Sequence, residues 1–204
     1  MLLSTAYFPP LSWFALAARS GECFVEACEH YQKQSYRNRC YILSPNGPQM
    51  LQVPVVHGAD MRITQVKVDY STPWLVRTQR ALDTAYESSA FYEYYRDGLF
   101  AVLEQKPETL WDLNLNTLRW CLERCHIGTR LFPTSDFAAP GSVQQDWRYA
   151  IHPKKKDCIL CECGLEKPYY QVFRDKLGGF TPGLSILDLL FNEGPDSLLW
   201  IGRN

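Results

Sequence analysis

Apolar and polar positions alternate along the first third of the chain, which is the pattern of short, half-buried strands. Apolar runs bounded by turn residues predict strands at 2–6, 22–28, 39–43, 49–56 and 63–69. Residues 11–19 instead place apolar side chains at helical spacing and are followed by Ser20 and Gly21, which is typical of a helix end. The chain therefore opens with a strand, a helix and a second strand.

The middle of the chain has the periodicity of amphipathic helices. It predicts three helices, at 74–88, 91–105 and 107–126. Further on, the pattern predicts a strand at 129–132, a loop at 135–145 and a short apolar helix at 184–191. The helices thus form one block that follows the strands.

This order of elements favours an α/β (or α+β) fold. A strand, helix and strand in succession take a parallel crossover by default, whereas Asn46 and Gly47 between two strands predict an antiparallel hairpin. We therefore expect a mixed sheet, begun by the crossover unit and the hairpin and covered by the three helices. No flexible linker separates these parts, so residues 1–204 are expected to form a single domain.

Composition and charge narrow the classes of function. The 204 residues are 46% hydrophobic and 14% aromatic, as in a packed globular protein. Lys and Arg number 21 against 22 Asp and Glu, without a basic stripe, which argues against nucleic-acid binding. The chain has no run of about 18 apolar residues and no basic start of a signal peptide. We therefore expect no membrane insertion and a cytoplasmic location.

The eight cysteines are accordingly expected to be reduced thiols. Four of them lie within apolar strand or helix patterns and are predicted to be small buried side chains: Cys23, Cys40, Cys121 and Cys125. Cys158, Cys161 and Cys163 form a cluster with His152 nearby, but a tetrahedral zinc site normally draws on two separated ligand pairs. We predict a cysteine-rich hairpin loop and no metal there.

The densest run of potentially reactive side chains, residues 26–39, lies between two predicted strands. Ligands of α/β proteins bind beyond the carboxyl ends of parallel strands, so this run is the predicted functional site. The catalytic candidates are His30, Glu29 and Lys33. The substrate-binding candidates are Tyr31, Arg37, Asn38, Arg39 and Tyr7.

His30 is the candidate general base, because histidine titrates near neutral pH. Glu29 would point to the opposite face of an extended chain, and Glu26 could orient His30 only if the strand continues past it. Arg37 and Arg39 could present forked donors to a carboxylate or a phosphate. Alternatively, His30 is an ordinary surface histidine and both arginines pair with carboxylates of the helical block.

Cys28 could be a nucleophile if a cationic neighbour lowered its pKa, although an inert buried thiol is the preferred interpretation. The segment 152–156, with His152 and three lysines, could contact a phosphate of a nucleotide-sugar or lipid carrier, or could be a solvated turn. Asp188 and Asn192 share one helix face and could close the pocket or, as we prefer, cap the helix end.

The chain resembles the WbqC-like family, especially the version common in Bacteroidetes-type bacteria. The resemblance rests on motifs at 7–10 (YFPP) with Trp13 and Phe14, 29–34 (EHYQKQ), 37–39 (RNR), 46–47 (NG), 53–55 (VPV), 169–173 (YYQVF) and 184–195 (LSILDLLFNEGP). Two departures are Leu3, Ser4 and Thr5 where the family has His-Gln-Pro, and Ala27 and Cys28 where it has an acidic pair. The resemblance implies a product of O-antigen gene clusters.

Two hypotheses about function follow. The resemblance implies a transferase of glycine or a related acyl group onto a surface polysaccharide, with a small-molecule donor and a sugar or glycan precursor as partners. The alternative is a non-catalytic protein that binds a small ligand or a partner in glycan assembly. Since the chain has neither a phosphate loop nor a dinucleotide fingerprint, the sequence identifies no cofactor.

Overall fold

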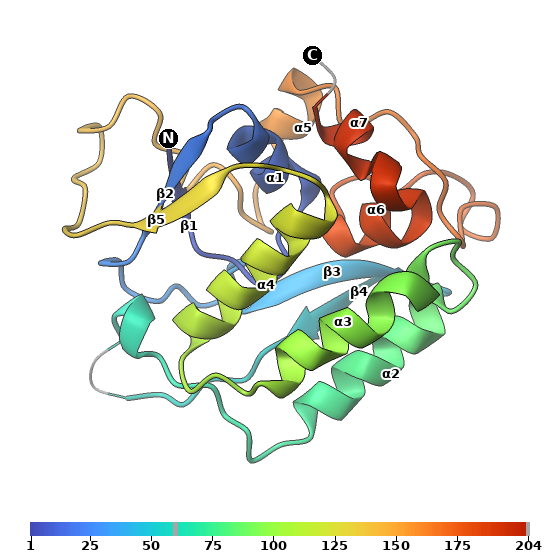
Figure 1. Ribbon diagram of the computed structural model, residues 1–204, viewed down its shortest axis with the longest axis horizontal. Helices are drawn as coiled ribbons and strands as arrows, with labels where there is room; N and C mark the ends of the chain where they lie inside the picture. Colours follow the sequence, from blue (N-terminus) through green and yellow to red (C-terminus); the bar gives the residue numbers. More distant parts are fainter. Residues whose placement is uncertain (59–60, 203–204) are drawn as a thin grey trace.

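The computed structural model describes residues 1–58 and 61–202. The strands are β1 (Leu2–Ser4), β2 (Glu22–Glu26), β3 (Arg39–Ser44), β4 (Gly47–Gln52) and β5 (Arg130–Pro133). The helices are α1 (Leu11–Ala18), α2 (Trp74–Tyr86), α3 (Tyr92–Glu104), α4 (Leu110–Arg124), α5 (Cys158–Glu162), α6 (Ile186–Glu193) and α7 (Ser197–Ile201). Two 3₁₀ helices, η1 (Ile63–Gln65) and η2 (Gly194–Asp196), complete the order. The predicted α/β class is confirmed (Figure 1).

A three-stranded parallel sheet carries the opening crossover unit, in the order β1-β2-β5. Leu2 pairs with Phe24 of β2, and Cys23 of β2 pairs with Leu131 of β5. The outer edge of β1 is also covered, because the Leu2 N–H donates to the Gln145 carbonyl at 2.9 Å. The carboxyl ends of the three strands therefore meet at one edge of the sheet, as the parallel crossover predicts.

The antiparallel hairpin forms a second, two-stranded sheet of β3 and β4. It pairs Arg39 with Gln52 at its open end and Ser44 with Gly47 at its turn. Gly47 has a φ of 103°, a conformation that only glycine adopts without strain. The predicted hairpin is thus confirmed, with Pro45 and Asn46 between the strands and Gly47 as the first residue of β4. The two kinds of pairing divide between two separate sheets.

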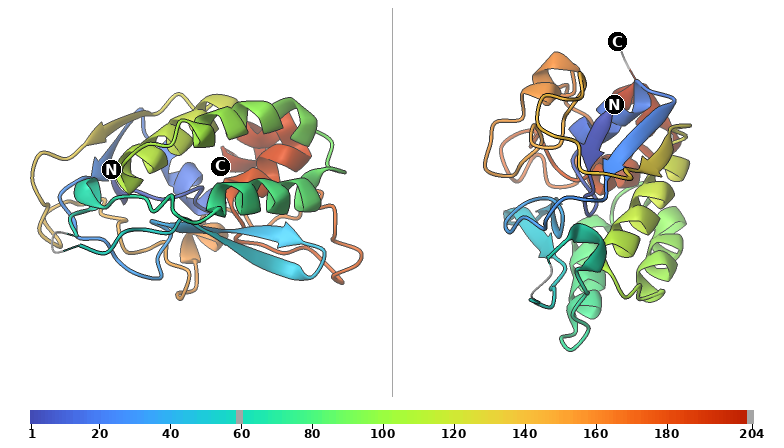
Figure 2. Two further views of the ribbon diagram at one scale, coloured as in Figure 1. Left: turned by 90° about the horizontal axis from the view of Figure 1, so that it is seen from below. Right: turned by 90° about the vertical axis from the view of Figure 1, so that its left-hand side faces the viewer.

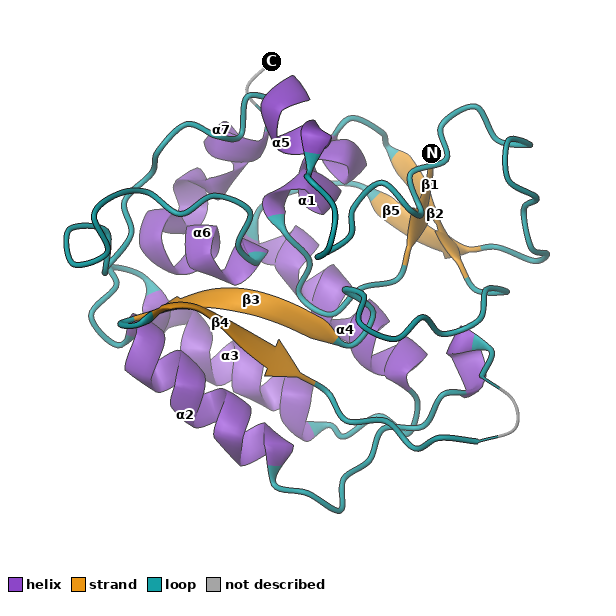
Figure 3. Cartoon of the chain, turned by 180° about the vertical axis from the view of Figure 1, so that it is seen from behind, coloured by secondary structure: helices purple, strands orange, loops and turns teal. Residues whose placement is uncertain are grey.

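The three predicted helices of the middle region form a layer over the hairpin (Figure 2, left). Helix α2 packs on β3 and on α3, and α3 packs on α4. Helix α6 also packs against β3, as well as against α3 and α4 (Figure 3). One hydrophobic cluster joins these layers and contains buried side chains from Leu3 to Ile201. The apolar stripes of the helices account for this core, because each faces a sheet or another helix.

Three expectations about local structure were wrong. Residues 63–69 do not form a strand: η1 begins at Ile63, and Val68 makes only an isolated bridge to Val55. The cysteine cluster forms the short helix α5 rather than a hairpin loop, because the Asp157 carboxylate accepts the N–H of Ile159 at 3.1 Å and caps it. Strand β2 ends at Glu26, so it does not continue toward His30.

Among the described residues, none of the helices has the length and apolar character needed to cross a bilayer.

Candidate functional site

A buried ion pair between Glu29 and Arg37 holds the predicted functional segment together. Arg37 Nε donates to Glu29 Oε1 at 2.8 Å, and Arg37 Nη2 donates to Glu29 Oε2. Arg37 Nη2 also donates to the hydroxyl of Ser4, the last residue of β1, at 2.9 Å. Both side chains are nearly inaccessible, with exposed fractions of 4% and 2%. The pair therefore closes the loop 29–37 and fastens it to the carboxyl end of β1.

This pairing determines what Glu29 can do. Burial raises the pKa of the Glu29 carboxyl, and the hydrogen bonds and charge of Arg37 oppose that rise. Both of its oxygens accept from the guanidinium, so neither is free to take a proton from a substrate. The structure thus gives Glu29 a positioning role, and its predicted catalytic role has no accessible atom to act through.

A second buried ion pair lies beside the first, between Glu26 at the end of β2 and Arg148. Arg148 Nη1 donates to Glu26 Oε2 at 2.7 Å, and both side chains are fully buried. Glu26 Oε1 accepts from the Thr134 hydroxyl at 2.6 Å and from the Cys28 N–H at 3.0 Å. Arg148 also donates to both carboxylate oxygens of Asp146, at 2.9 and 2.6 Å. Glu26 is therefore fully engaged and does not orient His30.

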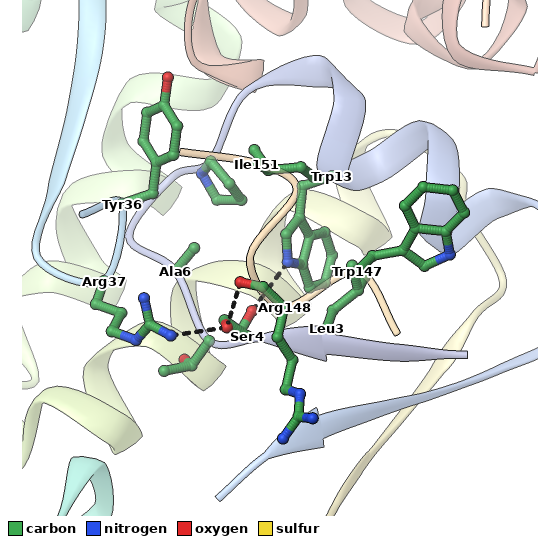
Figure 4. Close-up of a pocket in the computed structure, with 11 residues that line it drawn as sticks. Leu3, Ser4, Ala6, Trp13, Tyr36, Arg37, Trp147, Arg148 and Ile151 are labelled. Carbon is green, nitrogen blue, oxygen red and sulfur yellow. Dashed lines mark hydrogen bonds between the residues drawn. The ribbon is translucent and has the colours of Figure 1, made fainter. Parts of the chain in front are cut away.

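A small cavity separates the two arginines (Figure 4). It measures about 20 Å³, room for about one water molecule. Ser4 lies at its floor, where its hydroxyl donates to the Arg148 carbonyl at 2.9 Å, and its own carbonyl accepts from the Trp13 indole at 3.1 Å. Ile151 lines the same cavity. The cavity is too small for a sugar, so a substrate would have to lie on the open surface outside it.

The remaining catalytic candidates, His30 and Lys33, do not line this cavity. His30 and Lys33 are exposed, and among the described residues neither side chain makes a hydrogen bond or an ion pair. The backbone at this point is fixed, because the Tyr31 N–H donates to the Met61 carbonyl at 2.7 Å. The structure therefore presents His30 to solvent on a rigid segment and does not bring it into contact with Glu29.

The substrate-binding candidates divide into buried and accessible residues. Tyr7 is fully buried in the core, and its ring centroid lies 4.6 Å from that of Phe8. Asn38 is also buried and donates to the Val53 carbonyl at 2.8 Å, which fixes the start of the hairpin. Tyr31 and Arg39 remain partly exposed. Of the five residues predicted to bind substrate, only these last two can reach a ligand on the surface.

A second polar centre, which the sequence did not predict, surrounds Asp188 on α6. Its carboxylate is fully buried and accepts from Tyr86 at 2.8 Å, Tyr169 at 2.6 Å and Gln171 at 2.8 Å. Burial raises its pKa. The cluster joins α2, α6 and the 169–181 loop, so Asp188 is a structural residue and does not close a pocket. Asn192, one turn later, donates to the Asp188 carbonyl at 2.7 Å.

The thiols also divide by accessibility. Cys23, Cys40, Cys121 and Cys125 are buried, as predicted. Burial raises the pKa of Cys23 to about 12, which makes it unreactive. Cys28 is half-buried with Sγ 3.4 Å from the Ser135 carbonyl, and the two exposed thiols of α5 are Cys158 and Cys161. No group of three or more His, Cys, Asp or Glu side chains among the described residues could hold a metal ion.

Comparison with known proteins gives two matches. A family model described as the WbqC-like protein family matches residues 5–157. An uncharacterised protein of Mycobacterium tuberculosis is 28% identical over 218 residues, which cover 96% of this chain and 94% of that protein. No solved structure matches the chain significantly.

Proposed function

Since the chain belongs to the WbqC-like protein family, we propose that it is a transferase of bacterial surface polysaccharide biosynthesis. The group transferred would be an aminoacyl group such as glycyl, or another acyl group. The acceptor would be a hydroxyl or an amine of a sugar or glycan precursor. The protein would act in the cytoplasm, as the sequence predicts.

The observation that carries this proposal is the rigid presentation of residues 29–39 at the carboxyl end of the parallel sheet. The Glu29–Arg37 pair and Ser4 fix both ends of the loop. Preorganised polar groups at this edge are what an α/β ligand site requires. The chemistry of the site would then rest on the side chains that the loop exposes, His30, Lys33, Tyr31 and Arg39.

In the proposed reaction, His30 takes the proton of the acceptor as the acceptor oxygen or nitrogen attacks the donor's carbonyl carbon. The tetrahedral intermediate then collapses, the bond to the donor's leaving group breaks, and the imidazolium returns the proton to that group. Tyr31 and Arg39 would bind the substrate. Neither step needs a further reactant.

A specific observation favours the alternative, a non-catalytic ligand-binding protein. The cavity between the arginines holds about one water molecule, whereas enzymes usually enclose much of a small substrate. In that case the same surface would bind a ligand without transforming it.

The experiment that separates these functions replaces the gene in its host by His30→Gln and measures the mass of the surface glycan. We expect the acyl or aminoacyl substituent to fall at least about tenfold, because general-base catalysis contributes roughly 10²–10⁴-fold. His57→Gln, another exposed histidine, is the matched control and should leave the glycan unchanged. An unchanged glycan in both His30→Gln and Arg39→Ala cells would remove the transferase proposal.

A further inference from the structure

Helix α5 carries two exposed thiols on one of its faces. Cys158 is the first residue of the helix and Cys161 is the fourth, and both side chains are exposed. Residues three apart in an α-helix are neighbours on the same face. Helical geometry places their Cα atoms about 5 Å apart, and a disulfide joins Cα atoms that are about 4.4–6.8 Å apart. The two thiols can therefore be bridged while the backbone of α5 stays close to helical.

The other face of α5 fixes the helix in the core. Ile159 and Leu160, which lie between the two cysteines, have exposed fractions of 3% and 7%. The helix packs on α1 of the crossover unit (Figure 3). Asp157, which caps α5, accepts from the buried Ser12 hydroxyl of α1 at 2.5 Å. The two thiols are therefore presented to solvent by an anchored helix and not by a free loop.

The third cysteine of this region, Cys163, is separated from the pair by burial and by direction. It is 3% exposed, and its N–H donates to the Ile159 carbonyl at 2.8 Å, which holds it at the end of the helix. Burial raises the pKa of its thiol, and a thiol with a raised pKa reacts slowly. Residues two apart along a helix do not face each other. Cys158 is therefore the favoured partner of Cys161.

Two neighbouring thiols can hold a metal ion or exchange with a disulfide. In the part of the chain that the structure describes, no group of three or more His, Cys, Asp or Glu side chains could hold a metal ion. A Cys-X-X-Cys pair with both thiols accessible is instead typical of thiol–disulfide exchange.

We propose that Cys158 and Cys161 form a reversible dithiol–disulfide pair that exchanges with a soluble disulfide of low molecular weight. The thiolate of one cysteine attacks a sulfur atom of that disulfide, whose S–S bond breaks and releases one half as a thiolate. The thiolate of the other cysteine then attacks the mixed disulfide, forms the Cys158–Cys161 bond and releases the second half. The two cysteines are thereby oxidised by two electrons, and the soluble disulfide takes up these electrons and two protons to become two thiols.

This pair contains no residue of the candidate site at 29–39, so the inference goes beyond the proposed function. In a reducing compartment disulfides are usually transient. We therefore expect the pair to be a dithiol at rest and to close when the fraction of soluble disulfide rises.

The test exposes the folded full chain to glutathione disulfide, stops the exchange with acid, and alkylates the remaining thiols in denaturant. Of the eight cysteines, we expect all to be alkylated before oxidation and all but two afterwards, with no glutathione left on the protein. Trypsin cuts after Lys156 and Lys167 and so releases residues 157–167, which contain Cys158, Cys161 and Cys163. Mass spectrometry of this peptide should show the alkyl group on Cys163 and a disulfide between the other two.

Single variants separate the two steps of the exchange. Cys161→Ser should stop at the mixed disulfide, with one glutathione on Cys158. This mixed disulfide should last at least about tenfold longer than in the wild type, because ring closure within one helix turn is intramolecular. The matched controls Cys163→Ala and Cys28→Ser should form the Cys158–Cys161 disulfide at the wild-type rate. The wild-type peptide gives the decisive result even if a variant fails to fold.

Reduced glutathione, added after oxidation, should restore all the alkylatable thiols. Three results would each overturn the proposal: a lasting glutathione adduct on wild-type Cys158 or Cys161, a disulfide that includes Cys163, or full alkylation after exposure to about 10 mM glutathione disulfide. None of these measurements uses a transfer reaction, so the dithiol pair and the proposed transferase can fail separately.

Discussion

Replacing Arg148 by Met tests whether the buried Glu26–Arg148 pair holds the sheet edge together. The substitution keeps most of the side-chain volume but removes the donor to Glu26 at 2.7 Å and both bonds to Asp146. Removing one partner of a buried ion pair typically costs about 3–5 kcal/mol. Glu26 keeps three hydrogen-bond donors, the Thr134 hydroxyl and two backbone N–H groups. We therefore expect the free energy of unfolding to fall by about 3 kcal/mol, the lower end of this range.

The assay is urea unfolding followed by far-UV circular dichroism at neutral pH, with the free energy of unfolding extrapolated to water. Arg148→Met should lower the urea concentration at the midpoint of unfolding. It should leave unchanged the slope of the unfolding free energy against urea concentration. Arg80→Met, exposed on α2, is the matched control and should stay within about 0.5 kcal/mol of the wild type.

The double variant Glu26→Gln/Arg148→Met separates the buried charge from lost packing. The double variant removes the uncompensated carboxylate of Glu26. Its free energy of unfolding should therefore be at least about 1 kcal/mol higher than that of Arg148→Met. A loss below about 1 kcal/mol in the single variant, or no recovery in the double variant, would refute the claim that an unpaired buried charge is the cause.

Four further predictions concern other parts of the fold. Asp188→Leu should lower the free energy of unfolding by at least about 3 kcal/mol, because it removes the buried acceptor of the Tyr86 and Tyr169 hydroxyls and one of the two acceptors of the Gln171 amide. Burial raises the pKa of Asp188. The free energy of unfolding of the wild type should therefore fall as the pH rises from the pKa of this group in the unfolded chain to its pKa in the folded protein. Measured over a pH series, this dependence should be absent in Asp188→Asn. Gly194→Ala would place a Cβ 2.5 Å from the Phe91 ring at a φ of +56° and should lower the free energy of unfolding by about 1–3 kcal/mol. In the control Gly128→Ala, the added Cβ has no atom within 4 Å. Equal melting temperatures of the two variants would contradict this prediction. With a thiol reagent, the two exposed thiols of α5 should react first, Cys28 more slowly and the buried thiols only on unfolding; fast labelling of four or more would contradict the burial pattern.

The sequence predicted best those parts of the fold whose signals are local. Asn46 and Gly47 determine the hairpin turn, and the helical periodicity marked α2, α3 and α4 to within a few residues. Within the predicted strand at 63–69, Val66 and Val68 are buried. The strand prediction failed because Lys67 and Val68 each bridge a single residue of a different segment, so no ladder forms.

The candidate site was only partly predictable, because its pairings are long-range. The run 26–39 marked the right region, and Arg37 and Glu29 lie within eight residues of each other. Nothing near Glu26 in the sequence indicates Arg148, and nothing near Asp188 indicates Tyr86. A charged residue in an apolar pattern signals that a partner exists, but only the tertiary structure identifies it.

The distance along the chain between Glu26 and Arg148 has a consequence for how the protein is made. They are 122 positions apart, which a ribosome covers in roughly 6–24 s at typical elongation rates. For most of that interval β1, α1 and β2 have been synthesised without β5, which begins at Arg130, and the Glu26 carboxylate is unpaired throughout. Long-range contacts form late in folding, so we expect the N-terminal crossover unit to become stable only after residue 148 has been made.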